Sequence, residues 1–331
     1  MAGALGCGLA FGSAAFACDA VIAPVITLDH GSRYQVEDSS RSAIDAASNR
    51  AVTEALKPVD DFIRALSRDV TAAIRSNDLG RAECGIAAIA TWAEADALSR
   101  LDSFNARLAV GGRLAGIVTA YGHLRPLVSA TPQTDAIDAW LSRRTAAQID
   151  FWEKDATTGA RRGNLRAWAS LAILLTGQIT DDDAARFWAY ASAARILCST
   201  RPDGSLPQET RRGKFGLHYQ FHAIAPLVTI AASAQREGMP LSGMCHDALS
   251  RAVTFALTDY RNRGAATEDY AGAVQSYFDG TQTLEAHVLA WIPAYLTLHR
   301  DPLVLDVAND YPELLNSKLG GDQWLLWPDP R

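Results

Sequence analysis

After its first 17 residues, the sequence contains no apolar run as long as the roughly 20 residues of a membrane-spanning helix. It also lacks an excess of positive charge, because 31 lysines and arginines stand against 37 aspartates and glutamates. This balance argues against a protein whose main ligand is the nucleic-acid backbone. No repeat of fixed length and no convincing strand pattern is present. With 48% apolar residues, the chain is expected to be an all-α protein with a sizeable core.

The first 17 residues carry only small and apolar side chains. Ala15-Phe16-Ala17 has the small-x-small pattern at which signal peptides are cleaved, although the usual basic segment is absent. We therefore expect residues 1–17 to be a signal peptide and residues 18–331 to form a single domain. The mature protein would be periplasmic or secreted. The alternative is that the first residues form a buried helix.

The five cysteines fit this expectation. Without Cys7, the remaining four form an even number, as an oxidising compartment favours. Four cysteines allow three pairings, among which we favour Cys18–Cys84 and Cys198–Cys245. Four buried free thiols are the alternative.

From residue 42 onward, apolar residues recur at spacings of three and four, the pattern of amphipathic helices. Pro58 is expected to end one helix and to open the next. The segments predicted to be helical are 44–74 (divided at Pro58), 82–98, 108–124, 136–151, 164–175, 180–198, 215–236, 247–258 and 281–299. The tail at 319–327 is expected to be a short extended piece. About ten helices joined by short turns favour a curved or closed array of helix pairs around a cleft.

Two segments carry the residues that favour a specific chemistry. Arg211-Arg212-Gly213-Lys214 concentrates positive charge shortly before Tyr219, and Asn164 begins a predicted helix that also carries Trp168. Arg212 and Tyr219 are seven residues apart, about two turns, so on one helix they would share a face. An enzyme that removes a proton next to a carboxylate needs a proton-transferring group and cations or amides that stabilise the enolate.

These segments resemble those of the alginate lyases of polysaccharide lyase family 5. That family carries the motif Asn-Asn-His-x-Tyr-Trp, and residues 163–168 here read Gly-Asn-Leu-Arg-Ala-Trp. It also carries Leu-Pro-Asn-Glu, then Arg, then Tyr-His-x-Tyr-Ala-x-x-Pro-Leu. Residues 206–227 contain Leu-Pro-Gln-Glu, Arg212, and Tyr-Gln-Phe-His-Ala-Ile-Ala-Pro-Leu. Residues 32–40 resemble the family's lid, and residues 319–322 resemble its C-terminal signature.

The resemblance implies an incomplete α/α toroid with a deep cleft, and β-elimination of an acidic polysaccharide such as alginate or a related exopolysaccharide. It implies that Tyr219 removes the C5 proton of a uronate and returns a proton to the leaving oxygen. Arg212 would help to keep Tyr219 ionised, since a nearby cation lowers the pKa of a tyrosine. Asn164 would bind the uronate carboxylate, and Trp168 and Tyr34 would offer apolar faces to sugar rings.

Five further residues are candidates for substrate binding: Arg166, Arg211, Lys318, His218 and His222. The two histidines are four positions apart but lack a recognisable third ligand, so no metal site is expected. No cofactor is expected either. The predicted partner is an acidic polysaccharide, and the protein is expected to be a monomer.

The sequence departs from the family pattern where the family has a catalytic histidine, because this position is Leu165. Leucine transfers no proton, and the loss of a general acid or base costs about 10²–10⁴-fold in rate. Three interpretations follow. The enzyme works with Tyr219, Arg212 and Asn164, with His218 or His222 supplying the missing imidazole; it cleaves a different uronate polymer; or it has kept a sugar cleft without the chemistry.

Two other classes of protein remain open from the sequence. A glycoside hydrolase on a similar toroid would need two carboxylates at a working separation, and Glu209, Asp155 and Glu153 are the candidates. A polysaccharide-binding periplasmic protein would need neither the tyrosine nor the carboxylates.

Overall fold

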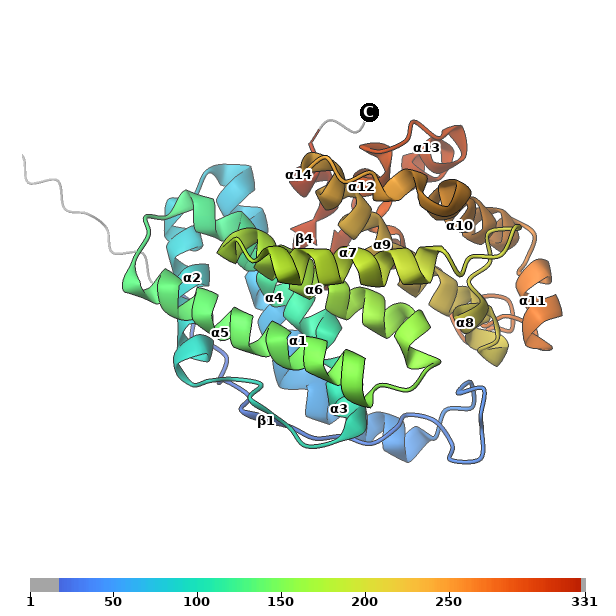
Figure 1. The fold of residues 1–331 in the computed structure, drawn as a ribbon, viewed down its shortest axis with the longest axis horizontal. Helices are drawn as coiled ribbons and strands as arrows, with labels where there is room; N and C mark the ends of the chain where they lie inside the picture. Colours follow the sequence, from blue (N-terminus) through green and yellow to red (C-terminus); the bar gives the residue numbers. More distant parts are fainter. Residues whose placement is uncertain (1–17, 329–331) are drawn as a thin grey trace, which may run out of the picture.

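The structure, a computed structural model, describes residues 18–328 (Figure 1). The expected signal peptide and Cys7 lie outside these residues. The described chain is dominated by helices, as the sequence predicts. Its strands are four two-residue pieces: β1 (Thr27–Leu28) pairs in parallel with β2 (Arg100–Leu101), and β3 (Leu315–Asn316) pairs in antiparallel with β4 (Gly321–Asp322).

The α-helices have the following bounds: α1 Ala46–Ser76, α2 Leu79–Glu94, α3 Phe104–Ala109, α4 Gly111–Leu124, α5 Pro132–Asp150, α6 Asn164–Thr180, α7 Asp183–Leu197, α8 Pro207–Thr210, α9 Gly216–Arg236, α10 Met244–Arg261, α11 Ala265–Ala271, α12 Ile292–Leu296, α13 Pro302–Asn309 and α14 Gln323–Leu326.

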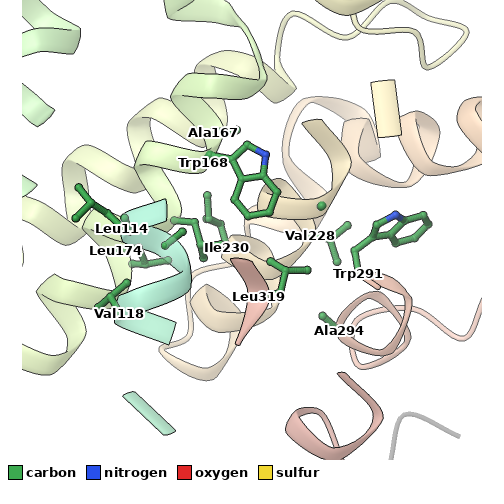
Figure 2. Packing of buried hydrophobic residues seen from close by; sticks show 14 of the residues in the cluster. Leu114, Val118, Ala167, Trp168, Leu174, Val228, Ile230, Trp291, Ala294 and Leu319 are labelled. Carbon is green, nitrogen blue, oxygen red and sulfur yellow. The ribbon is translucent and has the colours of Figure 1, made fainter. Parts of the chain in front are cut away.

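Helix α6 is central to the packing, since it contacts α4, α5, α7 and α9. Leu114 and Val118 of α4, Leu174 of α6 and Ile230 of α9 converge in one core (Figure 2). Helices α4 and α6 approach so closely that a Cβ on Gly111 would lie 2.8 Å from the Cβ of Ala169. Glycine at this point therefore fixes where α6 lies.

The prediction that Pro58 separates two helices is wrong, because α1 runs through it without a break. Asp45 caps the helix by accepting a hydrogen bond from the backbone N–H of Ser48. On both sides of Pro58 the helix buries one continuous apolar face, which includes Leu56 and Phe62. This packing outweighs the backbone hydrogen bond that a proline removes.

The prediction of a long helix at 281–299 is also wrong. The segment contains a 3₁₀ turn, Ala286–Leu289, and the five-residue α12. Pro293 stands in the first turn of α12, the place in a helix where proline is best tolerated. Glu285 is extended just upstream of the 3₁₀ turn (φ −91°, ψ 153°), which prevents a helix from continuing through it. In the C-terminal tail, the prediction of an extended piece at 319–327 holds only for β4 (Gly321–Asp322). Asp322 caps α14, so residues 323–326 are helical instead.

Both favoured disulfides are confirmed. Cys18–Cys84 attaches the start of the described chain to α2, and Cys198–Cys245 joins the end of α7 to α10. In the part of the chain that the structure describes, no helix is both long and apolar enough to cross a bilayer.

Candidate active site

A groove brings together segments that are far apart in the sequence. Its middle is a cavity of about 280 Å³. The lining residues named in the sequence analysis are Tyr34, Asn164, Leu165, Trp168, Arg212, His218, Tyr219, His222 and Lys318. A hollow of about 500 Å³ shares Asn164, Leu165 and Arg212 with this cavity, and another of about 900 Å³ shares Trp168, His222 and Lys318. Because the neighbouring hollows share lining residues with the cavity, the three adjoin one another and form one groove.

Asn164 is the first residue of α6 and is held by Glu209 of α8. Its backbone N–H donates to Glu209 Oε1 and its side-chain Nδ2 donates to Glu209 Oε2, each over 2.7 Å. Glu209 is fully buried, and this burial raises the pKa of its carboxyl group from 4.5 to about 6. The remaining side-chain atom of Asn164, Oδ1, lies 3.0 Å from Nδ1 of His222 on α9.

Arg212 and Tyr219 meet, although they do not share a helix as predicted. Arg212 precedes a 3₁₀ turn, Gly213–Phe215, and α9 begins only at Gly216. The guanidinium carbon of Arg212 nevertheless lies 4.0 Å from the centre of the Tyr219 ring. Arg212 is anchored by donating hydrogen bonds to the backbone carbonyls of Ser40 and Arg41, while the hydroxyl groups of Tyr34 and Tyr219 are hydrogen-bonded to each other.

The Tyr219 hydroxyl is protonated in the ligand-free site. Burial raises its pKa above the usual value of 10, the neighbouring Tyr34 raises it further, and Arg212 lowers it by less. The expectation that Arg212 keeps Tyr219 ionised therefore does not describe the resting state. A protonated tyrosine at this place is a proton donor.

His218 and His222 lie on the same face of α9, with ring centres 6.3 Å apart. Burial lowers the pKa of His218 to about 4 and lowers the pKa of His222 well below 6.5. Both rings are therefore neutral near pH 7. Among the described residues, no group of three or more His, Cys, Asp or Glu side chains could hold a metal ion.

Lys318 and Trp168 form the wall beside His222. The Lys318 ammonium lies 5.8 Å from the Trp168 ring centre, within reach of a cation–π contact. Desolvation and the nearby Arg113 lower the pKa of Lys318 to about 8. The Trp168 indole Nε1 is 3.2 Å from Nδ1 of His222. The groove thus combines an aromatic face with a cation.

A family model described as "Alginate lyase" matches residues 97–266, slightly more than half of the chain. The chain belongs to the alginate lyase family. A polysaccharide lyase of Stenotrophomonas maltophilia (strain K279a) is 28% identical over 294 residues, which cover 87% of this chain and 85% of that protein. An alginate lyase of Pseudomonas aeruginosa (strain LESB58) is 27% identical over 314 residues, covering 92% and 84%. The predicted family and the prediction of a polysaccharide lyase are confirmed.

Solved structures confirm the fold. Alginate lyase A1-III from Sphingomonas species A1 matches with a TM-score of 0.79 at 21% identity, covering 94% of this chain and 86% of that one. The same enzyme complexed with a tetrasaccharide matches with a TM-score of 0.82 at 20% identity, covering 95% and 86%. The predicted α/α toroid is therefore correct.

Two of the residues predicted to bind substrate lie apart from the centre of this alginate lyase-type site. Arg166 is buried and turned toward α7, where it forms an ion pair with Glu153 (2.6 Å) and packs on the Trp188 ring. It follows Asn164 by two positions, about 200° around the helix, which explains why it faces away from the groove. Arg211 is exposed and lines the hollow of about 500 Å³ next to Leu165.

Leu165 lines the groove where the family has histidine, so this wall is apolar here. Two other positions that differ from the family motifs have structural roles: Ala167 lies in the core, and the Gln220 side chain accepts a hydrogen bond from Leu206 N and donates to Gly204 O and Ala252 O. His222, where the family motif has tyrosine, lines the groove instead. Glu209 holds Asn164 in place, a role that its sequence context did not suggest beyond that of a hydrolase carboxylate. Its place in the Leu-Pro-Gln-Glu motif was the available signal.

The carboxylates that a glycoside hydrolase would need are already engaged. Glu209 is bound by Asn164, Glu153 pairs with Arg166, and Asp155 pairs with Arg107 at 2.9 Å. The groove therefore offers none of these three as a free acid–base pair, and the hydrolase alternative is not favoured.

Proposed function

We propose that this polysaccharide lyase cleaves a uronate-containing polymer, such as polymannuronate or a related exopolysaccharide, by β-elimination. The observation that carries the proposal is the convergence of Tyr219, Asn164 and Lys318 on one groove. These side chains supply a proton-transferring hydroxyl, an amide and a cation, the groups that elimination next to a carboxylate requires.

In the proposed complex, the uronate carboxylate lies near Lys318 and the Asn164 amide. Glu209 uses one hydrogen of Asn164 Nδ2, so the second hydrogen is available to the carboxylate as it becomes an enolate. When the bond between C4 and O4 breaks, the protonated Tyr219 hydroxyl can donate to the departing oxygen without prior ionisation. Arg212, packed on the Tyr219 ring, stabilises the tyrosinate that results.

A polyanionic substrate also suits the rest of the groove. The hollow of about 900 Å³ continues along α1, where it is lined by Arg64, Arg68 and Arg75 and by the carboxylates Asp60, Glu313 and Asp322, the last of which pairs with Arg75 at 2.5 Å. With Lys318, the lysine and arginine side chains of this hollow outnumber its carboxylates four to three. The chain as a whole carries a net charge of −6, so a polyanion would be attracted by this local arrangement and not by the overall charge. Trp168 and Tyr34 remain the proposed aromatic contacts to sugar rings.

We further propose that the protein works in the periplasm or outside the cell. The two disulfides support this location, since such bonds persist in oxidising compartments. The signal peptide at residues 1–17 and the monomeric state stay predictions.

The test is the ultraviolet absorbance of unsaturated product ends, measured with mannuronate-rich alginate, guluronate-rich alginate, glucuronan, pectate and hyaluronan. We expect a rise on at least one polymer, and Tyr219→Phe should reduce it by about 10²–10⁴-fold while polymer binding is retained. Tyr270→Phe, at an exposed tyrosine on α11, is the matched control and should keep full activity.

Full activity in Tyr219→Phe would refute the role of this hydroxyl. New reducing ends without absorbance would identify a hydrolase, and a bound polymer that is never cleaved would identify a binding protein.

A further inference from the structure

We infer that His222 is the base that removes the C5 proton, and that a chain of hydrogen bonds from Glu209 through Asn164 fixes its imidazole in the tautomer that this step needs. The inference rests on the proposed elimination reaction. It assigns the removal of the C5 proton, a step that Tyr219 cannot perform while its hydroxyl is protonated. This chain has leucine where the family has its histidine (Leu165), and it has a histidine, His222, where the family motif has tyrosine. His222 can therefore supply the imidazole that position 165 lacks.

The first link orients the Asn164 amide. An ionised carboxylate only accepts hydrogen bonds, and Glu209 faces both the backbone N–H and the side-chain amide of Asn164 at 2.7 Å. The amide group that faces Glu209 must therefore be Nδ2. This removes the usual ambiguity between the oxygen and nitrogen of an asparagine side chain, and it places Oδ1 on the side of His222.

The second link sets the tautomer of His222. Asn164 Oδ1 lies 3.0 Å from His222 Nδ1, and an amide oxygen only accepts. Nδ1 must therefore carry the hydrogen. The longer contact from Trp168 Nε1, at 3.2 Å, would require Nδ1 to accept, and two lone pairs would then face each other across the shorter contact.

The third link leaves Nε2 as the reactive atom. In a neutral imidazole with its hydrogen on Nδ1, Nε2 has a free lone pair. His222 lines the groove, and within the described part of the chain its Nε2 has no hydrogen-bond partner.

The charges around His222 keep the ring neutral in the resting site. The titratable groups that face or lie near it are Lys318, His218, Arg212, His287, Tyr219 and Glu209. Burial is the largest cause that lowers the pKa of His222, and Lys318, His218, Arg212 and His287 lower it further. The ring is therefore neutral, and its Nε2 lone pair is available to accept a proton.

His222 fits the role better than His218. The Nδ1 atom of His218 lies 3.3 Å from the Tyr277 hydroxyl, which can either donate or accept and so enforces no tautomer. The Tyr219 and His222 rings are 6.2 Å apart and nearly perpendicular, with both side chains lining the same cavity. This separation leaves the base and the proton donor beside one bound sugar.

The proposed step is balanced. The C5–H bond breaks and its proton goes to Nε2 of His222, while its electron pair forms the double bond between C4 and C5. The bond between C4 and O4 breaks with its electron pair on O4, and the Tyr219 hydroxyl gives O4 its proton. His222 then returns its proton, through water, to the tyrosinate.

The test compares His222→Gln with His218→Gln, a matched loss of the other imidazole in the same groove. His222→Gln should lower kcat by about 10²–10⁴-fold with polymer affinity retained, while His218→Gln should lower it by less than about tenfold. Free imidazole should restore part of the activity of His222→Gly and none of that of Tyr219→Phe. Equal losses in the two glutamine variants, or no rescue, would overturn the assignment of the base.

A measurement on the unmodified, ligand-free protein tests the hydrogen-bond chain without relying on activity. Nitrogen NMR of the ¹⁵N-histidine-labelled protein should show His222 protonated at Nδ1 and bare at Nε2. Glu209→Gln, which frees the Asn164 amide, should mix the two tautomers. A hydrogen on Nε2 in the unmodified protein would overturn the chain even if the enzyme is an active lyase. The absence of unsaturated product on every polymer would overturn the elimination, and the base with it, whatever the tautomer.

Discussion

The buried carboxyl group of Glu209 makes a quantitative prediction about stability. Its pKa is raised from 4.5 to about 6 in the folded protein because the carboxyl group is buried beside the first residue of α6, Asn164. A pKa difference of this size corresponds to about 2 kcal/mol between the protonated and ionised forms. The folded state binds the proton more tightly than the unfolded state does. This contribution to stability is therefore fully present below pH 4.5 and is lost as the pH rises through about 6.

The perturbation is Glu209→Gln, which removes the titration and keeps the size of the side chain. Urea unfolding without reductant would give the free energy of unfolding of both proteins at several values between about pH 4 and pH 7. Other titrating groups affect both proteins alike, so the difference between them isolates Glu209. We expect the free energy of unfolding of the unsubstituted protein to fall by about 2 kcal/mol relative to that of Glu209→Gln as the pH rises from about 4 to about 7.

A control substitution is available at Glu94, an exposed glutamate at the end of α2. Glu94→Gln removes the same charge from the surface. The reasoning is refuted if the difference for Glu209→Gln is constant with pH, if it moves in the opposite direction, or if Glu94→Gln reproduces it.

Two further predictions concern the groove. Leu165→His restores an imidazole at the family position beside Asn164, and we expect activity on mannuronate-rich alginate to rise by about tenfold or more, measured by product absorbance; no gain on any uronate polymer would show that the site is built around another base. Because the pKa of Lys318 is lowered to about 8, its ammonium is lost as the pH rises through that value. We expect polymer affinity to fall by about tenfold between about pH 7 and pH 9. Lys318→Arg, which stays charged, should flatten that dependence, and an equally steep fall in both proteins would exclude Lys318 as the cause.

Most of the helical segments could be predicted from the sequence. Apolar residues at spacings of three and four identify helices directly, and α6 and α9 begin within a residue of their predicted starts. Pro58 was misjudged because the cost of a proline is local, whereas the apolar face that outweighs it spans the whole of α1. The prediction of one helix at 281–299 is wrong because the apolar residues of this segment are buried in a short 3₁₀ turn and the short helix α12. Apolar composition alone does not distinguish such short pieces from one long helix.

The sequence identified most of the active-site residues, but how their side chains are oriented depends on the tertiary structure. Asn164, Tyr219 and Arg212 were recognised from spacing and motif, but spacing did not reveal that Arg212 stacks on the tyrosine ring from outside the helix. Arg166 shares a motif with Asn164 and still points the other way, because helical geometry separates neighbours by about 100° per residue.

The sequence by itself determined an all-α chain and its family, because periodicity and motif are local properties. It gave an even number of cysteines and a favoured pairing, and the structure confirmed that pairing. Only the tertiary structure decided which protonation states the site holds. Burial raises the pKa of Tyr219 and of Glu209 and lowers that of His222, and burial depends on what packs above each group. The contact between Asn164 and His222 joins residues 58 positions apart. No local pattern encodes that distance, since it is set by how α6 packs against α9.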